Sequence, residues 1–425
     1  MEKIKVGIFG LNRGASHIQG FLANNAEIVA VCDKMPEQLE KAKAKLGNHV
    51  DYYTDFDEFI EHKMDAVLLA NHFHEHVPYA LRCLEKNIHV LSECTAASTM
   101  AECVALVRAA EKSKAKYMLC ENYPFMKFNL EIKRVCDSGS LGKLLYAEGE
   151  YNHPSAPSDV NFVKKFRKFE KHWRHFLPAT YYLTHSLAPL MYATGAEPIR
   201  VTALPVCFPA KDTYAISHCS DRAAVITTLN NDKSVFKFFG WSTFGGHGNS
   251  YRICGTDGQI ENVRGTNGKI MLRYNAWSKP ADLEEATQFY MPDWNDKDKN
   301  LIENSGHGGS DFIVVRNFLD CIRNDTQPCF DVYFATKMSA VAILGHRSLL
   351  ELGNAYDVPD FRREEDRVKW ENDTLSPFYY EDGREPTIPC GSDPNYLPSA
   401  EQLEAFRKDI AGTDTSDDLT NPMQG

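Results

Sequence analysis

The chain has 425 residues, of which 43% are hydrophobic and 25% charged, enough for two globular domains with separate cores. Its formal net charge of −11 argues against nucleic acid as a partner, because neutralising phosphates needs a basic surface. No apolar run reaches the roughly 18 residues of a membrane span. The opening MEKIKVGIFG has no signal-peptide pattern, so we expect a cytoplasmic protein without a membrane partner. The cysteines form no CxxC pair, which indicates reduced thiols.

Short apolar runs alternate with amphipathic stretches over the first part of the chain. The runs KVGIFG, EIVAVCD, AVLLAN, HVLSE and KYMLCEN have the length and branched aliphatic content of strands. Stretches with helical periodicity, such as PEQLEKAKAKLG and AECVALVRAAEKS, lie between them. This alternation predicts an α/β Rossmann domain, a doubly wound parallel sheet, over residues 1–122.

The pattern changes after residue 122. The strand-like stretches YAEGEYNH, PIRVTAL, AAVITTLNND, SVFKFFGW, YRICGTDGQIENV and KIMLRYN follow one another with turn residues between them. Helical patterns return at about 309–324 and 333–352. We therefore predict an α+β domain with an open, mainly antiparallel sheet over residues 123–358. Residues 359–425, which are charged and contain several prolines, are expected to wrap over the body and to end in a disordered tail.

The first predicted strand runs into a turn typical of dinucleotide-binding domains. Gly10 permits the tight turn, and Ala15 is small enough for the following helix to pack on the strand. Asn12 stands where the fingerprint has its second glycine, and asparagine tolerates left-handed dihedral angles. The second strand ends in Asp33, where an acid meets the ribose hydroxyls and repels a 2′-phosphate. This favours NAD over NADP, although Lys34 argues the other way; a Rossmann sheet without a cofactor is the alternative.

Beyond this turn, the chain resembles the Gfo/Idh/MocA family of NAD(P)-dependent sugar enzymes over about residues 3–360. The family's Thr-Pro-x-x-x-His and Glu-Lys-Pro motifs match here at His76 and Glu93. Dehydrogenases of the family handle protons with the lysine of the second motif and with a histidine and an aspartate further on. Here Cys94 replaces that lysine and Ala188 that aspartate, while His185 keeps the histidine. Both replacements argue against simple reversible hydride transfer.

One branch of the family, glycoside hydrolase family 109, tolerates both losses, and several stretches here are similar to it. They are Met118–Asn122, Ala147–His153, Tyr182–His185, Gly306–Asp311 and Asp331–Tyr333. The resemblance implies a redox-neutral cleavage of a glycoside with tightly bound, recycled NAD: C3 is oxidised, the C2 proton and the C1 leaving group are eliminated, water adds, and C3 is reduced again. A sugar 3-dehydrogenase that releases a keto-sugar is the alternative. A non-catalytic NAD- or sugar-binding protein is a third possibility.

The resemblance also assigns residues to the site. Tyr182 and His185 are the catalytic candidates, because a spacing of three places both rings on one face of a helical turn, as base and acid. The alternative is that both pack a helix at the domain interface. The positions expected to hold the cofactor are Gly10, Leu11, Asn12, Arg13, Asp33, Asn71, His72, His76, Glu93, Cys94, Asn122, Trp173 and Tyr333. For Tyr333, ordinary core packing is the stronger alternative.

Five residues are expected to bind the sugar, each against a simpler interpretation. Glu121 ends the last strand of the first sheet and can accept from sugar hydroxyls, or it is a surface acid. Tyr151 and His153 share one face of a strand and line the pocket, or they face solvent. Arg174 binds a pair of sugar hydroxyls through its guanidinium, or it is a partner in a structural salt bridge. His307 contacts substrate, or it only precedes a helix that Asp311 caps.

Two further patterns concern ligands and partners. Residues 164–175 (KKFRKFEKHWRH) are basic and aromatic, which favours a solvated flank over an anion site. His72, His74 and His76 alternate as zinc ligands do, but no cysteine or acid completes a readable motif, so we expect no metal. The open sheet predicts a homodimer or homotetramer, and the expected partner is a small glycoside or sugar.

Overall fold

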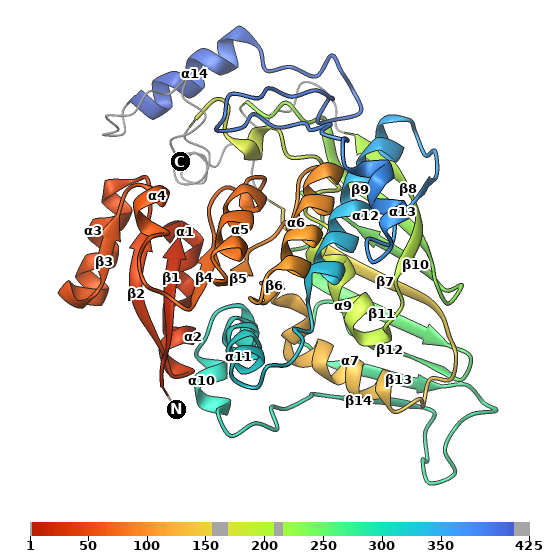
Figure 1. The fold of residues 1–425 in the computed structure, drawn as a ribbon. Helices are drawn as coiled ribbons and strands as arrows, with labels where there is room; N and C mark the ends of the chain where they lie inside the picture. The colour runs from red at the N-terminus through yellow and green to blue at the C-terminus, as the bar shows by residue number, and fades with distance from the viewer. Residues whose placement is uncertain (1, 155–168, 208–215, 412–425) are drawn as a thin grey trace.

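The computed structural model describes residues 2–154, 169–207 and 216–411. The predicted disordered tail and residues 164–168 of the basic stretch lie outside these ranges. Two sheets stand side by side with helices between them: the N-terminal sheet lies at the left of Figure 1 and the second at the right. Within the described ranges, no helix is long and apolar enough to cross a membrane.

The N-terminal domain contains the predicted parallel sheet. Its strands are β1 (Ile4–Phe9), β2 (Ala26–Cys32), β3 (Asp51–Tyr53), β4 (Ala66–Leu69), β5 (His89–Ser92) and β6 (Tyr117–Leu119), in the spatial order β3-β2-β1-β4-β5-β6. Every residue of β4 is buried, as expected for an apolar strand covered on both faces. The short edge strand β3 was not predicted, because its three residues are too few and too exposed to show a pattern. The fold prediction is otherwise confirmed.

Helices connect these strands, and local sequence explains where they begin. They are α1 (Leu11–Gly14), α2 (Ile18–Ala23), α3 (Pro36–Leu46), α4 (Phe56–Phe59), α5 (His76–Glu85) and α6 (Met100–Lys112). A proline occupies the first position of α3, where its missing N–H costs nothing. The helix α6 begins with a capping box, in which Thr99 and Glu102 each accept from the other's backbone N–H.

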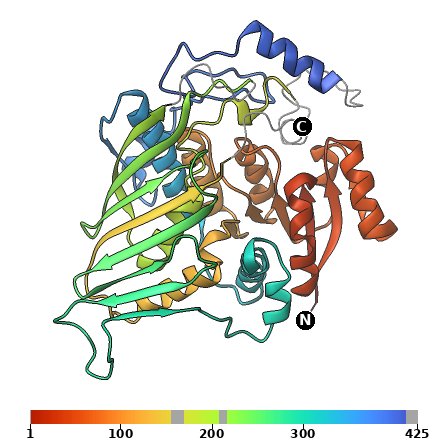
Figure 2. The same ribbon diagram turned by 180° about the vertical axis from the view of Figure 1, so that it is seen from behind.

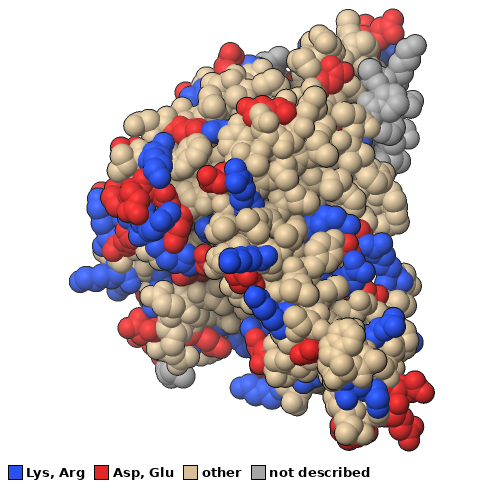
Figure 3. All heavy atoms as spheres, turned by 90° about the vertical axis from the view of Figure 1, so that its right-hand side faces the viewer, with Lys and Arg blue, Asp and Glu red and all other residues tan. Residues whose placement is uncertain are grey.

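The second sheet is open and mainly antiparallel, as predicted. Its strands are β7 (Leu144–Asn152), β8 (Pro198–Cys207), β9 (Asp221–Asn230), β10 (Val235–Phe239), β11 (Gly248–Gly255), β12 (Gly258–Asn262), β13 (Ile270–Tyr274), β14 (Thr287–Tyr290) and β15 (Tyr356–Asp357). The spatial order is β14-β13-β12-β11-β7-β10-β9-β8-β15. One pair, β10 with β7, runs parallel. The outer face, turned to the viewer in Figure 3, carries basic and acidic side chains among uncharged ones.

Helices of the second domain fill the space between the two sheets (Figures 1 and 2). They are α7 (Lys127–Asp137), α9 (Thr184–Thr194), α10 (Lys299–Glu303), α11 (Ser310–Arg323) and α12 (Val332–Leu350), with single turns at Tyr123–Phe125, Trp173–His175 and His307–Gly309. Gly149 on β7 lets α9 approach closely, because a Cβ there would stand 2.3 Å from the carbonyl oxygen of Ser186. This contact fixes the start of α9 and therefore the position of His185.

Residues 359–411 wrap over one end of both domains (Figure 1, blue). This extension contains α13 (Glu364–Trp370) and α14 (Ala400–Ala411). Its contacts reach both domains: the His74 ring hydrogen-bonds the Tyr379 carbonyl oxygen at 2.7 Å, and Cys219 Sγ donates to the Cys390 carbonyl oxygen at 3.2 Å. The extension therefore ties the two domains together at this end.

Candidate active site

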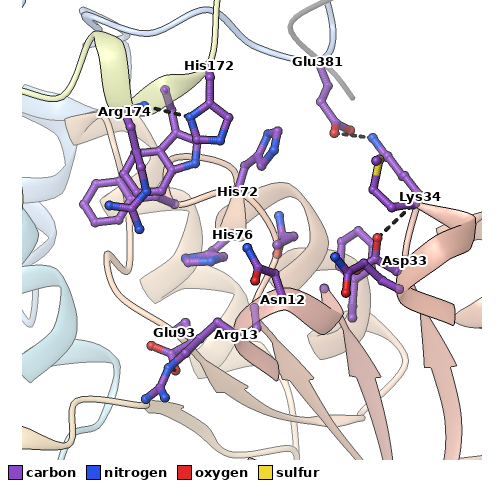
Figure 4. Close-up of a pocket in the computed structure, with 18 of the residues that line it drawn as sticks. Asn12, Arg13, Asp33, Lys34, His72, His76, Glu93, His172, Arg174 and Glu381 are labelled. Carbon is purple, nitrogen blue, oxygen red and sulfur yellow. Dashed lines mark hydrogen bonds and ion pairs between the residues drawn. The ribbon is translucent and has the colours of Figure 1, made fainter. Parts of the chain in front are cut away.

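A cavity of about 320 Å³ opens at the carboxyl ends of the first parallel strands, where doubly wound sheets bind ligands. Most of the predicted cofactor residues line it. The lining includes Gly10, Asn12, Arg13, Asp33, Lys34, Asn71, His72, His76, Glu93, Cys94, Trp173, Arg174, Tyr182 and Glu381. Figure 4 shows Asp33 and Lys34 on one side of the cavity, and Arg13, Glu93 and Arg174 on the other.

The turn after β1 has the shape that a dinucleotide needs. Gly10 has φ +88°, and a Cβ on it would stand 2.4 Å from the carbonyl oxygen of Ala70, so only glycine fits. Asp33 accepts from the backbone N–H of Leu11 at 2.6 Å and of Met35 at 2.8 Å, which fixes its carboxylate at the cavity wall. Burial raises the pKa of Asp33, while these two hydrogen bonds oppose that rise. The narrow turn and the fixed acid fit a bound NAD.

Arg13, at the cavity wall, connects α1 with the segment after β5 and with α11. Its guanidinium donates to Glu93 at 2.8 Å and to both oxygens of Asp311 at 3.0 and 3.2 Å. Burial alone would raise the pKa of Glu93. Arg13, and after it His17, outweigh this effect and lower the pKa from 4.5 to about 2. The Asn122 amide lies outside the cavity lining and donates to Asp311 at 2.7 Å, and its cofactor role stays a prediction.

Asp311, the acid that follows the Gly-His-Gly-Gly stretch, does not have the helix-capping role considered from the sequence. Asp311 does not cap α11, whose N-cap is Gly309; besides Arg13 and Asn122, it accepts from His307 Nδ1 at 2.9 Å. The His307 ring lies 6.3 Å from the Tyr123 ring, so it stands at the rim of the aromatic cluster described next. Sequence reasoning missed Asp311 as a hub, because its partners come from strands and turns far away in the chain.

Glu121 and His185 form a buried pair beside the cavity. Glu121 is 0% exposed, and its two carboxylate oxygens lie 2.8 and 3.1 Å from His185 Nδ1. Cys94 Sγ donates to the same carboxylate at 3.1 Å, and the Tyr123 N–H donates at 3.1 Å. Burial raises the pKa of Glu121, but His185 lowers it overall. Glu121 is thus no surface acid: its oxygens are turned to His185, and its predicted role in sugar binding stays a prediction.

Three tyrosines surround the His185 ring. Its centroid lies 3.9 Å from Tyr123 in a stacked arrangement, 4.9 Å from Tyr151 and 5.1 Å from Tyr182, the last two edge to face. Tyr182 precedes α9 and does not share a helical turn with His185, so the predicted geometry is wrong although the two rings do meet. Because Glu121 accepts at Nδ1, the proton of neutral His185 lies on Nδ1 and Nε2 carries the lone pair.

The predicted sugar residues on β7 and near Trp173 extend this cluster. Tyr151 is half-buried, which excludes the solvent-facing alternative, and the His153 ring lies 6.0 Å from it. The Arg174 guanidinium lies 4.3 Å above the Trp173 ring. Burial raises the pKa of Tyr182 and Tyr151 raises it further, whereas Arg174 opposes this, so the Tyr182 phenol is protonated near neutral pH.

Three predictions on ligands have different outcomes. Tyr333 lies outside the cavity lining, and its hydroxyl donates to Glu111 at the end of α6, so its cofactor role stays a prediction. His76 bonds the Thr95 carbonyl oxygen at 2.8 Å and His74 bonds the extension, whereas the ring of His72 lies with the carboxylates of Glu75 and Glu381, one ligand atom of each within 4.8 Å of the others. Of the basic stretch, the described Lys171 lies 4.4 Å above the Tyr379 ring, in the same extension.

Comparisons with known proteins agree with this geometry. Residues 4–120 match the model of the oxidoreductase family with an NAD-binding Rossmann fold, and residues 222–370 match the C-terminal domain of glycosyl hydrolase 109. A glycosyl hydrolase family 109 protein from Shewanella baltica is 25% identical over 402 residues, covering 85% of this chain and 86% of its own length. A relative from Shewanella putrefaciens with the same description is 24% identical with the same coverage.

Solved structures share the fold. Levoglucosan dehydrogenase in complex with NADH and levoglucosan has a TM-score of 0.70 at 17% identity, covering 84% of this chain and 100% of the other. An oxidoreductase from Agrobacterium radiobacter in complex with NAD+, L-tartaric acid and magnesium has a TM-score of 0.68 at 15% identity, covering 84% and 98%. Fold and cavity together define a two-domain NAD-binding enzyme. Residues 4–120 are similar to the NAD-binding domain of the Gfo/Idh/MocA oxidoreductases, and residues 222–370 are similar to the C-terminal domain of glycosyl hydrolase 109.

Proposed function

We propose that this protein is an NAD-dependent enzyme that cleaves a glycoside without net oxidation. The observation that carries the proposal is the buried Glu121–His185 pair, enclosed by three tyrosines beside the dinucleotide cavity. A base and a phenol side by side suit an elimination and an addition, and no flanking pair of catalytic carboxylates is needed in such a reaction. The glycosyl hydrolase family 109 relatives from Shewanella support the same reaction.

When bound, NAD would supply the reversible oxidation of the sugar at C3. The C3 hydroxyl proton passes to solvent water when C3 is oxidised and is regained when C3 is reduced again at the end of the cycle; between these two steps, the C3 ketone acidifies the proton on C2. His185 takes that proton at Nε2, and Glu121 stabilises the imidazolium that results. The bond from C1 to the leaving-group oxygen breaks as the Tyr182 hydroxyl gives its proton to that oxygen. Water then adds at C1 and returns a proton to Tyr182, while His185 returns its proton to C2. Each residue ends the cycle as it began.

The remaining predicted residues have supporting roles in this proposal. Tyr151, His153, Arg174 and His307 line or border the same space and are proposed to hold the sugar. Leu11, Asn12, Asn71, His72, His76, Glu93, Cys94 and Trp173 are proposed to enclose the dinucleotide with Gly10, Arg13 and Asp33. We propose the domains 1–122, 123–358 and 359–425 as the working division of the chain, and the outer face of the second sheet as the surface of a dimer or tetramer.

The proposal is tested with an aryl glycoside and the purified full-length protein, without added NAD. Release of the aryl group with no accumulating NADH supports it, and deuterium incorporated at C2 from heavy water locates the elimination. Stoichiometric NADH with a keto-sugar product would instead identify a net dehydrogenase, the activity in the name of the levoglucosan enzyme with the same fold. Bound NAD without turnover of any glycoside would identify a binding protein.

A further inference from the structure

The C-terminal extension contributes a side chain to the dinucleotide cavity. Glu381 lines this cavity together with Asp33 and Lys34, although more than three hundred residues separate them in sequence. Figure 4 shows the Glu381 carboxylate above Asp33, joined to the Lys34 ammonium by a dashed line. The dinucleotide site is therefore completed by a segment outside both folded domains.

Lys34 follows the acid that faces the ribose of a dinucleotide, and its positive charge suits a phosphate on the ribose 2′ oxygen. In this chain that charge already has a partner. The Lys34 ammonium forms an ion pair with Glu381 Oε1, and the two side chains are 40% and 25% exposed. A 2′-phosphate would have to displace the carboxylate and then lie beside it.

Glu381 is held in place from three directions. Its Oε2 accepts from the Tyr79 hydroxyl at 2.6 Å, and its backbone N–H donates to Glu75 Oε1 at 2.6 Å. The Tyr79 ring lies 4.7 Å from Phe9 and 4.6 Å from Phe56, so the hydroxyl that holds Glu381 is itself fixed by packing. The pair with Lys34 is thus a constrained one, unlike a flexible ion pair on an open surface.

The neighbours of Glu381 anchor the same segment to the N-terminal domain. The Tyr379 carbonyl oxygen is bound by the His74 ring at 2.7 Å, and the Tyr380 hydroxyl shares a hydrogen bond with Ser98 Oγ at 2.7 Å. Because the residues before Glu381 are fixed in this way, the carboxylate is presented at the cavity and does not depend on a loose tail.

We propose that Glu381 is a specificity-determining residue for the dinucleotide. It occupies Lys34 and adds a negative charge beside Asp33, so the site accepts the free ribose hydroxyls of NAD and rejects the 2′-phosphate of NADP. From the sequence alone, the positive charge of Lys34 favours NADP. The structure shows that Glu381 of the extension already pairs with this charge. The proposal rests on NAD binding by the N-terminal domain and is independent of which sugar reaction follows.

The test measures which nucleotide the full-length protein retains. Protein is equilibrated with equimolar NAD+ and NADP+ until the bound ratio is constant, passed through a desalting column, and denatured so that the released nucleotides can be quantified. Glu381→Gln keeps an acceptor for Tyr79 but removes the charge. Glu385→Gln, on the same extension with a side chain 73% exposed and 3.8 Å from Lys171, is the matched control.

We expect the NADP-to-NAD ratio to rise about tenfold in Glu381→Gln. Lys34, no longer paired with a carboxylate, can then form one charged hydrogen bond to the 2′-phosphate, and such a bond is strong enough for a change of this size. The ratio should be unchanged in Glu385→Gln and return to the wild-type value when Lys34→Met is added to Glu381→Gln. Lys34→Met alone should lower the ratio, because it leaves the Glu381 carboxylate without its cationic partner beside the ribose. An unchanged ratio in Glu381→Gln, or a rise that survives Lys34→Met, would overturn the proposal. So would a ratio that does not fall in Lys34→Met alone. None of these results depends on glycoside turnover.

Discussion

Replacing Glu121 by Gln is the sharpest test of the proposed chemistry. The carboxylate is fully buried and 2.8 Å from His185 Nδ1, and glutamine has nearly the same shape without the charge. Hydrogen bonds to charged groups contribute about 1.5–3 kcal/mol. Because about 1.4 kcal/mol corresponds to a factor of ten in rate, we expect kcat to fall about ten- to a hundredfold. The loss belongs to the step in which His185 carries a proton, so KM should change little.

The assay for this variant separates positioning from folding. Release of the aryl group gives kcat and KM, nucleotide retention reports the cofactor site, and thermal unfolding reports stability. Glu102→Gln is the matched control, because it also removes the charge of a hydrogen-bonded carboxylate, a half-buried one that caps α6 outside the cavity lining. It should lower the melting temperature and leave kcat unchanged. Glu121→Asp, which keeps the charge, should restore part of the rate. A Glu121→Gln variant with full kcat, or with its whole loss in KM, would refute the reasoning.

Three further predictions concern the base, the turn and the buried ion pair. His185→Ala should lower kcat about 10²–10⁴-fold while NAD is retained, as expected for loss of a general base; full activity would remove His185 from the site. Gly10→Val should abolish NAD retention and lower the melting temperature, because its Cβ would meet the Ala70 carbonyl oxygen at 2.4 Å. Gly139→Val is the control, since Gly139 has a similar φ of +72° with no atom within 4 Å, and it should keep NAD. Glu93, with its pKa lowered to about 2, stabilises the fold above its ordinary pKa of 4.5, and this contribution is lost as the pH falls toward about 2. In Glu93→Gln, unfolding measured against pH should therefore show a lower stability at neutral pH and a shallower acid limb; an acid limb like the wild type's would contradict this.

Local patterns predicted the parts of the fold that local physics controls. The strand β4 is apolar throughout and β1 is apolar except for Lys5, while Gly10 has a positive φ and no room for a Cβ, so these features are readable from a few residues. The edge strand β3 was not predicted, because three partly exposed residues are too few to show the alternation of apolar and polar residues that is typical of a strand. The parallel pairing of β10 with β7 was also unreadable, since it depends on which strands become neighbours.

Motifs in the sequence indicate the candidate site residues, but they do not show which residues far away in the chain each of them contacts. Glu121 looked like a ligand for sugar hydroxyls, because nothing near it in sequence shows that His185 faces it from a helix 64 residues later. Asp311 looked like a helix cap for the same reason. Glu381 lies in a charged, proline-bearing segment with no periodic signal, and only the path of the extension brings it to Lys34.

Cys94, which stands where the related dehydrogenases have a lysine, contacts the Glu121–His185 pair, and this contact gives a physical reason for the replacement. Burial raises the pKa of the Cys94 thiol well above its ordinary value, so the group is neutral when it donates to Glu121. A lysine at this position would place an ammonium against the same carboxylate and compete with the imidazole for its charge. With a neutral thiol there, no ammonium at position 94 competes with the His185 imidazole for the charge of Glu121. The loss of the lysine and the burial of Glu121 are therefore two parts of one arrangement, and this arrangement fits the proposed removal of the C2 proton by His185.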